Sequence, residues 1–184
     1  MAVDFNIQKG DLLIAEPFMQ DPNFKRTVTL VCEHNEEGSL GLVLNRPSIF
    51  KVTEMIPNFP AFQALVNYGG PVGLDRINYI HSYGDILEGA FHVIDNIYWN
   101  GNFEQLKDYI KRKIILPHNI RFFVGYAGWE AGQLNEEMQD YSWIISKKHE
   151  EIFKMNEYMW KDILQKMGGK NKLISTFPED PRLN

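Results

Sequence analysis

A ten-residue stretch, Gly125 to Leu134, restricts the possible folds most strongly, because it combines three glycines with two large aromatic residues. Glycine allows the backbone to adopt a positive φ or to approach another surface closely. Tyr126 and Trp129 each add a broad apolar face with one polar atom. The strand-like run 120–124 precedes the stretch and the helical pattern 133–140 follows it, which predicts a glycine-aromatic turn between a strand and a helix. Such a turn can cradle a ligand or plug the core with its rings, and the pattern favours neither.

The length of the chain, 184 residues, and its 44% content of hydrophobic residues predict one globular domain. We expect this domain to span residues 1–184, with a core over about 10–165 and a loosely held tail over 170–184. Residues 1–10 lack the basic-then-apolar layout of a secretory signal, and the apolar runs are too short for a membrane span. The single cysteine, Cys32, cannot form an internal disulfide. These features favour a cytoplasmic protein without membrane contact.

A net charge of −5 argues against broad electrostatic binding of nucleic acid, which depends on Lys and Arg to neutralise phosphates. The basic residues between 107 and 113 share a predicted helix with Glu104 and Asp108, which indicates a solvated helix face. Direct nucleic-acid binding is therefore not expected.

Short runs rich in Val, Ile, Leu and aromatic residues predict strands joined by short polar or glycine-bearing links, typical of antiparallel pairing. These runs cover residues 11–15, 26–33, 40–45, 77–81, 90–94, 97–99, 120–124 and 141–146, the first of them as an edge strand. A hairpin is predicted at Asn35–Gly38. Helices are predicted after the cap residue Asn102, over 133–140, and over 156–167 before the Gly168-Gly169 pair, with a short helix and a break within 52–66.

Cys32, Glu33 and His34 place a thiol, a carboxylate and an imidazole in sequence, a combination found in nucleophilic catalysis. On an extended strand Glu33 points away from the other two, so the three cannot form a compact relay. A structural cysteine beside a turn histidine is the favoured interpretation. His81, at a predicted strand end, is a second candidate base, and a hydrogen-bonded structural role is favoured for it too.

The five histidines show no metal-ligand spacing, so no metal site is predicted. The glycine spacings match neither the phosphate loop nor the dinucleotide fingerprint, and no cofactor is predicted.

Several segments, taken together and in order, are similar to one family. They are Gly10 to Met19 with Asp21, Pro22 and Phe24, Arg26 to His34 with Gly38, Gly41 to Pro47, Gly69 to Val72, Gly125 to Trp129, and Gly132 to Leu134. In this combination the chain resembles the AlgH/YqgE family of bacterial proteins over residues 10 to about 165. It departs at Asn135, where the family usually has glutamate, so no role that depends on that carboxylate carries over.

The resemblance implies a single α+β domain whose mostly antiparallel sheet bends into a partial barrel flanked by helices. It implies no reaction. Members are often labelled transcriptional regulators, yet the chain shows no helix-turn-helix pattern.

The leading hypothesis is therefore a non-catalytic module, linked to regulation, that binds a small molecule or a protein partner. Its expected site is one cleft that collects glycine-rich turns, aromatic faces, arginines and amides, a mixture suited to recognition. The predicted site residues are Arg26, His34, Asn45, Arg46, Gly69, Gly70, Tyr126, Trp129 and Gln133. The alternatives are a hydrolase or transferase that uses His34 or His81, with Cys32 as a further candidate, and a transcriptional regulator that contacts DNA.

Overall fold

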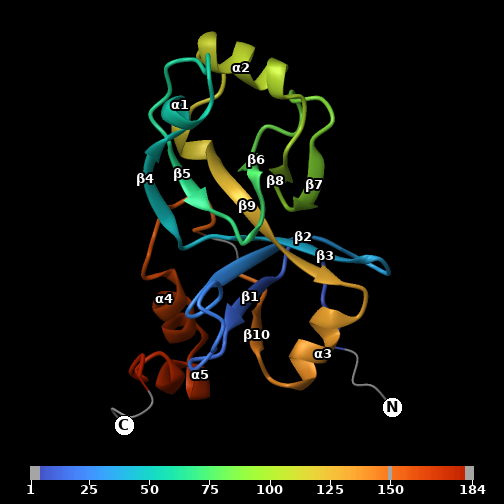
Figure 1. Ribbon diagram of the computed structural model, residues 1–184, viewed down its shortest axis with the longest axis vertical. Coiled ribbons are helices and arrows are strands. Elements are labelled where there is room, and N and C mark those ends of the chain that lie inside the picture. Colours follow the sequence, from blue (N-terminus) through green and yellow to red (C-terminus); the bar gives the residue numbers. More distant parts are fainter. Residues whose placement is uncertain (1–4, 149–150, 181–184) are drawn as a thin grey trace.

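One long strand, β9 (Ile120–Glu130), runs through both halves of the computed structural model, which describes residues 5–148 and 151–180 (Figure 1). Its first part pairs antiparallel with β6 (Val72–His81) and parallel with β5 (Leu65–Tyr68). Residues 127–130 of the same strand pair with β3 (Gly38–Val43). We call residues 47–119 the upper lobe, and residues 12–43 together with 133–174 the lower lobe. Because β9 pairs with strands of both, it joins the two lobes.

The lower lobe consists of β1 (Leu12–Ala15), β2 (Val28–Asn35), β3, α3 (Gln133–Gln139), β10 (Trp143–Ser146), α4 (Met159–Met167) and α5 (Gly169–Ile174). The upper lobe consists of β4 (Pro47–Lys51), α1 (Val52–Met55), β5, β6, β7 (Phe91–Ile94), β8 (Ile97–Trp99), α2 (Phe103–Lys111) and a 3-10 turn at Pro117–Asn119.

Within the described residues the strand order is β10-β1-β2-β3-β9-β6-β8-β7, with β4 joined through β5, and every pair except β5 with β9 is antiparallel. The expected single-domain α+β fold with a large antiparallel sheet is confirmed. This path of strands has two unpaired ends, so the sheet is not closed into a barrel. The strand β1, expected at an edge, lies between β10 and β2, because α3 returns the chain to place β10 beside it.

The glycine-aromatic stretch differs from its prediction, because the chain does not turn after Val124 but continues as a strand to Glu130. Gly125 has a φ of 68°, and a Cβ at this position would lie 2.3 Å from the carbonyl oxygen of Gly70. Glycine therefore allows β9 to pass close to the segment that precedes β6, instead of reversing the chain.

Local signals in the sequence explain other boundaries. Glu36 and Glu37 form the two-residue loop of the predicted hairpin, since Asn35 pairs with Gly38. The side chain of Asn102 caps α2 by accepting a hydrogen bond from the backbone N–H of Gln105 at 3.0 Å. These two predictions are confirmed.

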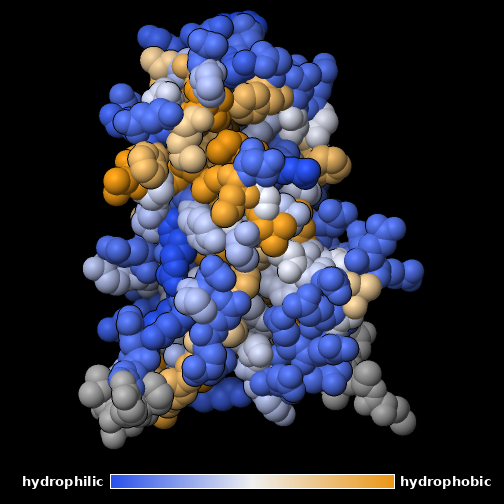
Figure 2. All heavy atoms as spheres, in the orientation of Figure 1, coloured by the Kyte–Doolittle hydropathy of each residue, from blue (hydrophilic) through white to orange (hydrophobic). Residues whose placement is uncertain are grey.

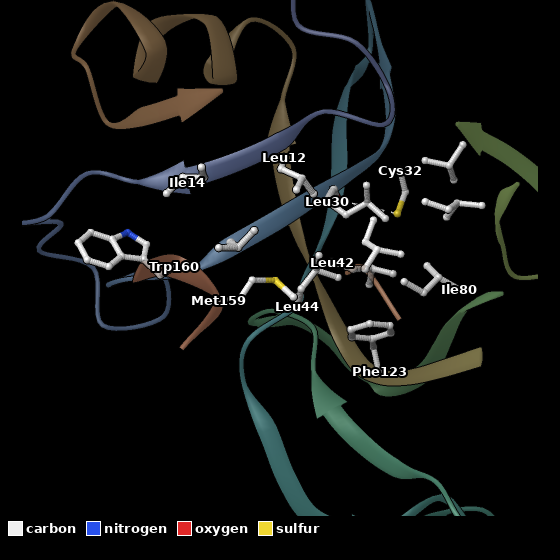
Figure 3. Packing of buried hydrophobic residues seen from close by; sticks show 14 of the residues in the cluster. Leu12, Ile14, Leu30, Cys32, Leu42, Leu44, Ile80, Phe123, Met159 and Trp160 are labelled. Atoms are coloured by element: carbon white, nitrogen blue, oxygen red, sulfur yellow. Dashed lines mark hydrogen bonds between the residues drawn. The ribbon is translucent and has the colours of Figure 1, made fainter. Parts of the chain in front are cut away.

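Buried side chains form three clusters on the faces of this sheet. The central cluster lies between the sheet and α4 and includes Leu30, Leu42 and Trp160 (Figure 3). Successive residues of β9 serve different clusters, because Phe123 belongs to the central one and Phe122 to the upper one, beneath α2. A third cluster lies beneath α3.

The C-terminal segment packs against the lower lobe. Within the span expected to be loosely held, residues 170–174 belong to α5, and the ring of Phe177 stacks on Phe18 with 5.8 Å between ring centroids. Residues 181–184 of that span lie outside the described residues.

Figure 2 shows apolar surface gathered over the upper lobe on this face and a mostly hydrophilic surface over the lower lobe. Exposed apolar side chains of the upper lobe include Ile49, Phe50 and Leu74. Among the residues described, no helix has the length and apolar character that a bilayer crossing requires.

Candidate functional site

Asn45 locks the corner that follows β3. Its side chain is buried, its Oδ1 accepts from the backbone N–H of Val28 at 2.9 Å, and its Nδ2 donates to the carbonyl of Arg26 at 2.9 Å. Both ends of the amide are therefore used to hold two chain segments together.

The two predicted arginines near this corner point at the protein's own carbonyl groups. Arg26 donates to the carbonyl of Phe177 at 2.6 Å, and its guanidinium lies 4.5 Å from the ring centroid of Trp160. Arg46 donates to the carbonyl of Lys25. Burial lowers the pKa of Arg46, and the negative charge of Glu179 partly opposes this shift. Both side chains hold neighbouring segments of the chain, Arg26 the C-terminal one.

Gly69 and Gly70 allow the close approach of the segment before β6 to β9. A Cβ on Gly69 would lie 2.5 Å from the carbonyl oxygen of Gly125, and one on Gly70 would lie 2.2 Å from the carbonyl carbon of Tyr126. Both positions therefore need glycine for packing.

Trp129 and Gln133 belong to a hydrogen-bonded group around Glu137. One carboxylate oxygen accepts from the indole N–H groups of Trp129 at 2.9 Å and Trp143 at 2.7 Å. The other accepts from the amide of Gln133 at 2.9 Å. Because Trp129 is buried, its ring packs in the cluster beneath α3 and does not face an open cleft.

His34 lines a hollow of about 320 Å³, which we call the His34 hollow, together with Ser39, Glu130, Gly132 and other residues of the hairpin and α3. Asn135, where the sequence departs from the family pattern, also lines it. The Nδ1 of His34 lies 2.7 Å from the hydroxyl oxygen of Ser39. A base beside a hydroxyl is one element of nucleophilic catalysis, so the hydrolase hypothesis with His34 stays a prediction.

Tyr126 lines a larger hollow of about 490 Å³, at the junction of the two lobes. We call it the Tyr126 hollow, and its walls come from β3, β6, β8, the residue after β8, and β9. It is lined by Leu40, Arg76, Ile77, Asn78, Trp99, Asn100 and Tyr126. The ring of Tyr126 is close to Gly73, where a Cβ would lie 2.9 Å from a ring carbon, so a larger residue at Gly73 would displace the ring.

Hydrogen bonds fix the amide of Asn78 in this hollow. Its Oδ1 accepts from the Nδ2 of Asn100 at 3.0 Å and from the indole N–H of Trp99 at 3.3 Å. Two donors at one end identify that end as the oxygen. The Oδ1 of Asn100 accepts from the backbone N–H of Tyr79 at 3.0 Å. The Nδ2 of Asn78 is buried and has no hydrogen-bond partner within the described residues.

The other two groups considered for catalysis are buried and occupied. His81 is fully buried, its Nε2 donates to the carbonyl of Asn100 at 2.8 Å, and its Nδ1 accepts from the backbone N–H of Tyr83 at 3.1 Å. Burial lowers the pKa of His81, although the bond to the Asn100 carbonyl opposes the shift, so the ring is neutral at pH 7. Burial, with the nearby charge of Glu33, raises the pKa of the Cys32 thiol. Among the residues that the structure describes, no three His, Cys, Asp or Glu side chains gather as metal ligands.

The structure thus distributes the nine predicted residues over four places. Arg26, Asn45 and Arg46 lie at one corner, Gly69 and Gly70 lie against Tyr126, Trp129 and Gln133 surround Glu137, and His34 lines its own hollow. Ligand binding by these residues stays a prediction. The polar wall residues of the Tyr126 hollow, Arg76, Asn78 and Asn100, were missed. An available signal was Asn78 itself, a polar residue at an inward position of a predicted strand.

Comparisons with known proteins agree with the fold. A family model described as AlgH-like matches residues 12–172. A UPF0301 protein of Chlorobaculum tepidum is 43% identical over an alignment of 187 positions that covers both chains completely. A UPF0301 protein of Chlorobium limicola is 42% identical over 97% of this chain and 96% of that protein.

Two solved structures are similar over nearly the whole chain. The AlgH protein from Pseudomonas aeruginosa superposes with a TM-score of 0.74 at 30% identity, covering 95% of this chain and 96% of that one. A protein from Corynebacterium diphtheriae superposes with a TM-score of 0.79 at 23% identity, covering 93% of each, and shows the fold alone. The order of the signature segments, the family match and the full-length relatives agree, and the chain belongs to the AlgH-like family.

Proposed function

We propose that this protein is a non-catalytic module that binds a small molecule in the Tyr126 hollow. The observation that carries the proposal is the Nδ2 of Asn78, a buried donor without a hydrogen-bond partner within the described residues. Buried polar groups are nearly always hydrogen-bonded, and each exception calls for a physical reason. An incoming molecule that supplies the partner is such a reason, because Asn78 lines the hollow.

The size and walls of the hollow support the same proposal. Its volume of about 490 Å³ lies in the range of small-molecule sites, which mix apolar and aromatic walls with a few oriented polar groups. Here Leu40, Trp99 and Tyr126 provide apolar surface, and Asn78 and Asn100 provide polar groups fixed by hydrogen bonds. Polar groups that are already fixed in this way lower the cost of ordering a site on binding.

The state of two of the three candidate catalytic groups, His81 and Cys32, supports binding without catalysis. Both ring nitrogens of His81 are engaged by backbone groups, and the Cys32 thiol is buried with a raised pKa. Neither offers a free base or a thiolate at pH 7.

The proposal includes a link to regulation. A molecule in the hollow contacts β3 of the lower lobe and β6 of the upper lobe, so it can favour one packing of the two lobes over another. A protein partner is the alternative occupant. A DNA-contacting role receives no support from the net charge of −5.

Nuclear magnetic resonance of the tryptophan indole groups tests this proposal with built-in controls. The chain has four tryptophans, and the indole N–H of Trp99 lies in the hollow, where it donates to Asn78. Trp129 and Trp143 donate to Glu137, and Trp160 donates to the carbonyl of Ala15, all outside the hollow. Trp99→Phe assigns the reporting signal in a 15N-labelled sample.

We expect compounds from a mixed library of anionic, neutral and cationic fragments to shift the Trp99 indole signal and leave the other three in place. Binding should also raise the melting temperature, since a ligand of the folded state stabilises it. Tyr126→Leu should weaken these shifts, whereas Ser39→Ala in the His34 hollow should not. A screen in which no fragment moves the Trp99 signal, or in which only the other indoles respond, contradicts the proposal.

A further inference from the structure

We infer that the ligand of the Tyr126 hollow is an organic carboxylate with a flat, apolar body. This inference rests on the proposed function and adds the chemical class of the ligand. It follows from which hydrogen-bonding groups of the hollow are already engaged and which are left over.

The acceptor oxygens fixed in the walls of the hollow are engaged. The Oδ1 of Asn78 receives two donors, and the Oδ1 of Asn100 receives the backbone N–H of Tyr79. The Asn78 Oδ1 therefore has no lone pair left, and a ligand that brings only donors, such as an ammonium group, finds among these oxygens just the second lone pair of the Asn100 Oδ1 open.

The remaining polar groups of the hollow are mainly donors. The Nδ2 of Asn78 has no partner, as described above. Arg76 lines the same hollow with an exposed side chain that makes no ion pair or hydrogen bond with the residues described. An unpaired guanidinium and an unpaired amide N–H₂ among the lining residues of one hollow are complementary to a carboxylate, which only accepts hydrogen bonds and carries the opposite charge.

The geometry also indicates how the carboxylate is reached. Asn78 is only 6% exposed and its Nδ2 is buried, so a lining side chain must move before a ligand contacts this atom. Arg76 is the side chain that the described contacts leave free to do so. Because guanidinium and carboxylate can form two parallel hydrogen bonds, Arg76 can move onto the bound ligand and cover it.

The apolar walls define the rest of the ligand. Leu40 and Ile77 present aliphatic surface, and Trp99 and Tyr126 present rings. Flat apolar groups pack against aromatic rings in offset or edge-to-face arrangements. The body of the ligand is therefore flat, with the carboxylate directed toward Asn78 and Arg76.

Three probes of matched shape test the ligand class on the full chain: naphthalene-2-carboxylate, naphthalene-2-carboxamide and 2-naphthylmethylammonium. Affinities are measured from the shift of the Trp99 indole signal. We expect the carboxylate to bind at least tenfold more tightly than the amide, and the ammonium compound not to bind. Affinity for the carboxylate should fall as the NaCl concentration rises, because Arg76 is exposed.

Two variants locate the carboxylate. Arg76→Gln removes an exposed cation and should weaken carboxylate binding about tenfold without changing the melting temperature of the free protein. Arg112→Gln, at the exposed arginine that caps the C-terminal end of α2, should have no effect. Asn78→Asp keeps an oxygen toward Trp99 and Asn100 but replaces the free donor, and should abolish carboxylate binding. If it fails to fold, Arg76→Gln alone decides.

The outcomes separate this inference from the proposed function. Equal binding of amide and carboxylate, or carboxylate binding unchanged in Arg76→Gln, overturns the inference while the hollow stays a ligand site. Fragments that shift Trp99 but are all neutral or cationic do the same. If neither the three probes nor the mixed library moves the Trp99 signal, the proposed function fails as well.

Discussion

Replacing Arg121 should destabilise the protein more than replacing any exposed arginine, because its buried guanidinium holds segments of both lobes together. This residue of β9 is 4% exposed. Its Nη1 donates to the carbonyl of Ile152 at 2.8 Å, and its Nη2 donates to the carbonyl of Leu44 at 2.6 Å and to the Oδ1 of Asn67 at 2.8 Å. Burial lowers the pKa of Arg121 to about 10, so the group is still charged at pH 7.

The expected magnitude follows from these three bonds. Arg121→Met removes the donor of these three acceptors and of the part-buried carbonyl of Lys154, which lies 3.3 Å from the Nη1. Each buried unsatisfied group costs about 1–3 kcal/mol, and the three buried acceptors are counted here. Their sum is about 3–9 kcal/mol, and it is partly offset because the variant no longer buries a charge, which itself costs several kcal/mol. We therefore expect the free energy of unfolding to fall by about 3 kcal/mol. Domains of this kind are stable by about 5–15 kcal/mol in total, so the variant should fold but with a small margin.

Urea unfolding followed by circular dichroism at pH 7 measures this change. Arg112→Met is the matched control, because Arg112 is exposed and lies 3.4 Å from Asp108 in a surface ion pair worth about 0–1 kcal/mol. Hydrogen exchange should also show faster exchange around Ile152 in Arg121→Met. An unfolding free energy within 1 kcal/mol of the unsubstituted protein would refute this reasoning, since it would mean that water replaces the guanidinium at these acceptors.

Three further predictions concern buried polar groups. Glu137→Ala should lower the free energy of unfolding, measured by urea unfolding, by about 2–3 kcal/mol, because the indole N–H groups of Trp129 and Trp143 lose their shared acceptor. Glu137→Gln keeps one side-chain oxygen and should therefore lower the free energy of unfolding by less. Equal stability of both variants and the unsubstituted protein would contradict this prediction. Burial lowers the pKa of His81, so below about pH 6.5 the unfolded chain binds more protons at this ring than the folded protein does. The free energy of unfolding should therefore fall as pH decreases below about 6.5, and this group should contribute at most about 1.4 kcal/mol per pH unit. Urea titrations across this pH range should show a shallower dependence in His81→Gln, and parallel curves would argue against the shift. The buried Cys32 thiol, with its raised pKa, should react with iodoacetamide at pH 8 only after unfolding in urea, and rapid alkylation of the folded protein, seen by mass spectrometry, would count against its burial.

Much of the fold could be predicted because local chemistry determines it. The Asn35–Gly38 hairpin and the Asn102 cap depend on residues within a few positions of each other. The continuation of β9 through Gly125 could not be predicted in this way, because its reason is the distant backbone of Gly70. Glycine permits both a turn and a close approach, and only the fold decides between them.

The candidate site was harder to predict, because the sequence identifies unusual residues but not the direction in which they point. Asn45, Trp129 and Gln133 are amide and aromatic residues suited to recognition, yet each is engaged by the protein itself. Tyr126 faces a hollow whose polar walls come from β6 and the end of β8, more than 20 residues away in sequence. That proximity arises from strand order, which residue spacing does not contain.

The position of β9 has a consequence for how such a chain can be inherited. One strand, β9, pairs with strands of both lobes. If one lobe were moved into another gene or replaced by an unrelated domain, strands of the other lobe would lose their partner and expose unpaired backbone N–H and C=O groups. Recombination should therefore transmit this architecture whole. The two relatives described above align with this chain over 96% and 100% of their own length, as expected if the two lobes are inherited together.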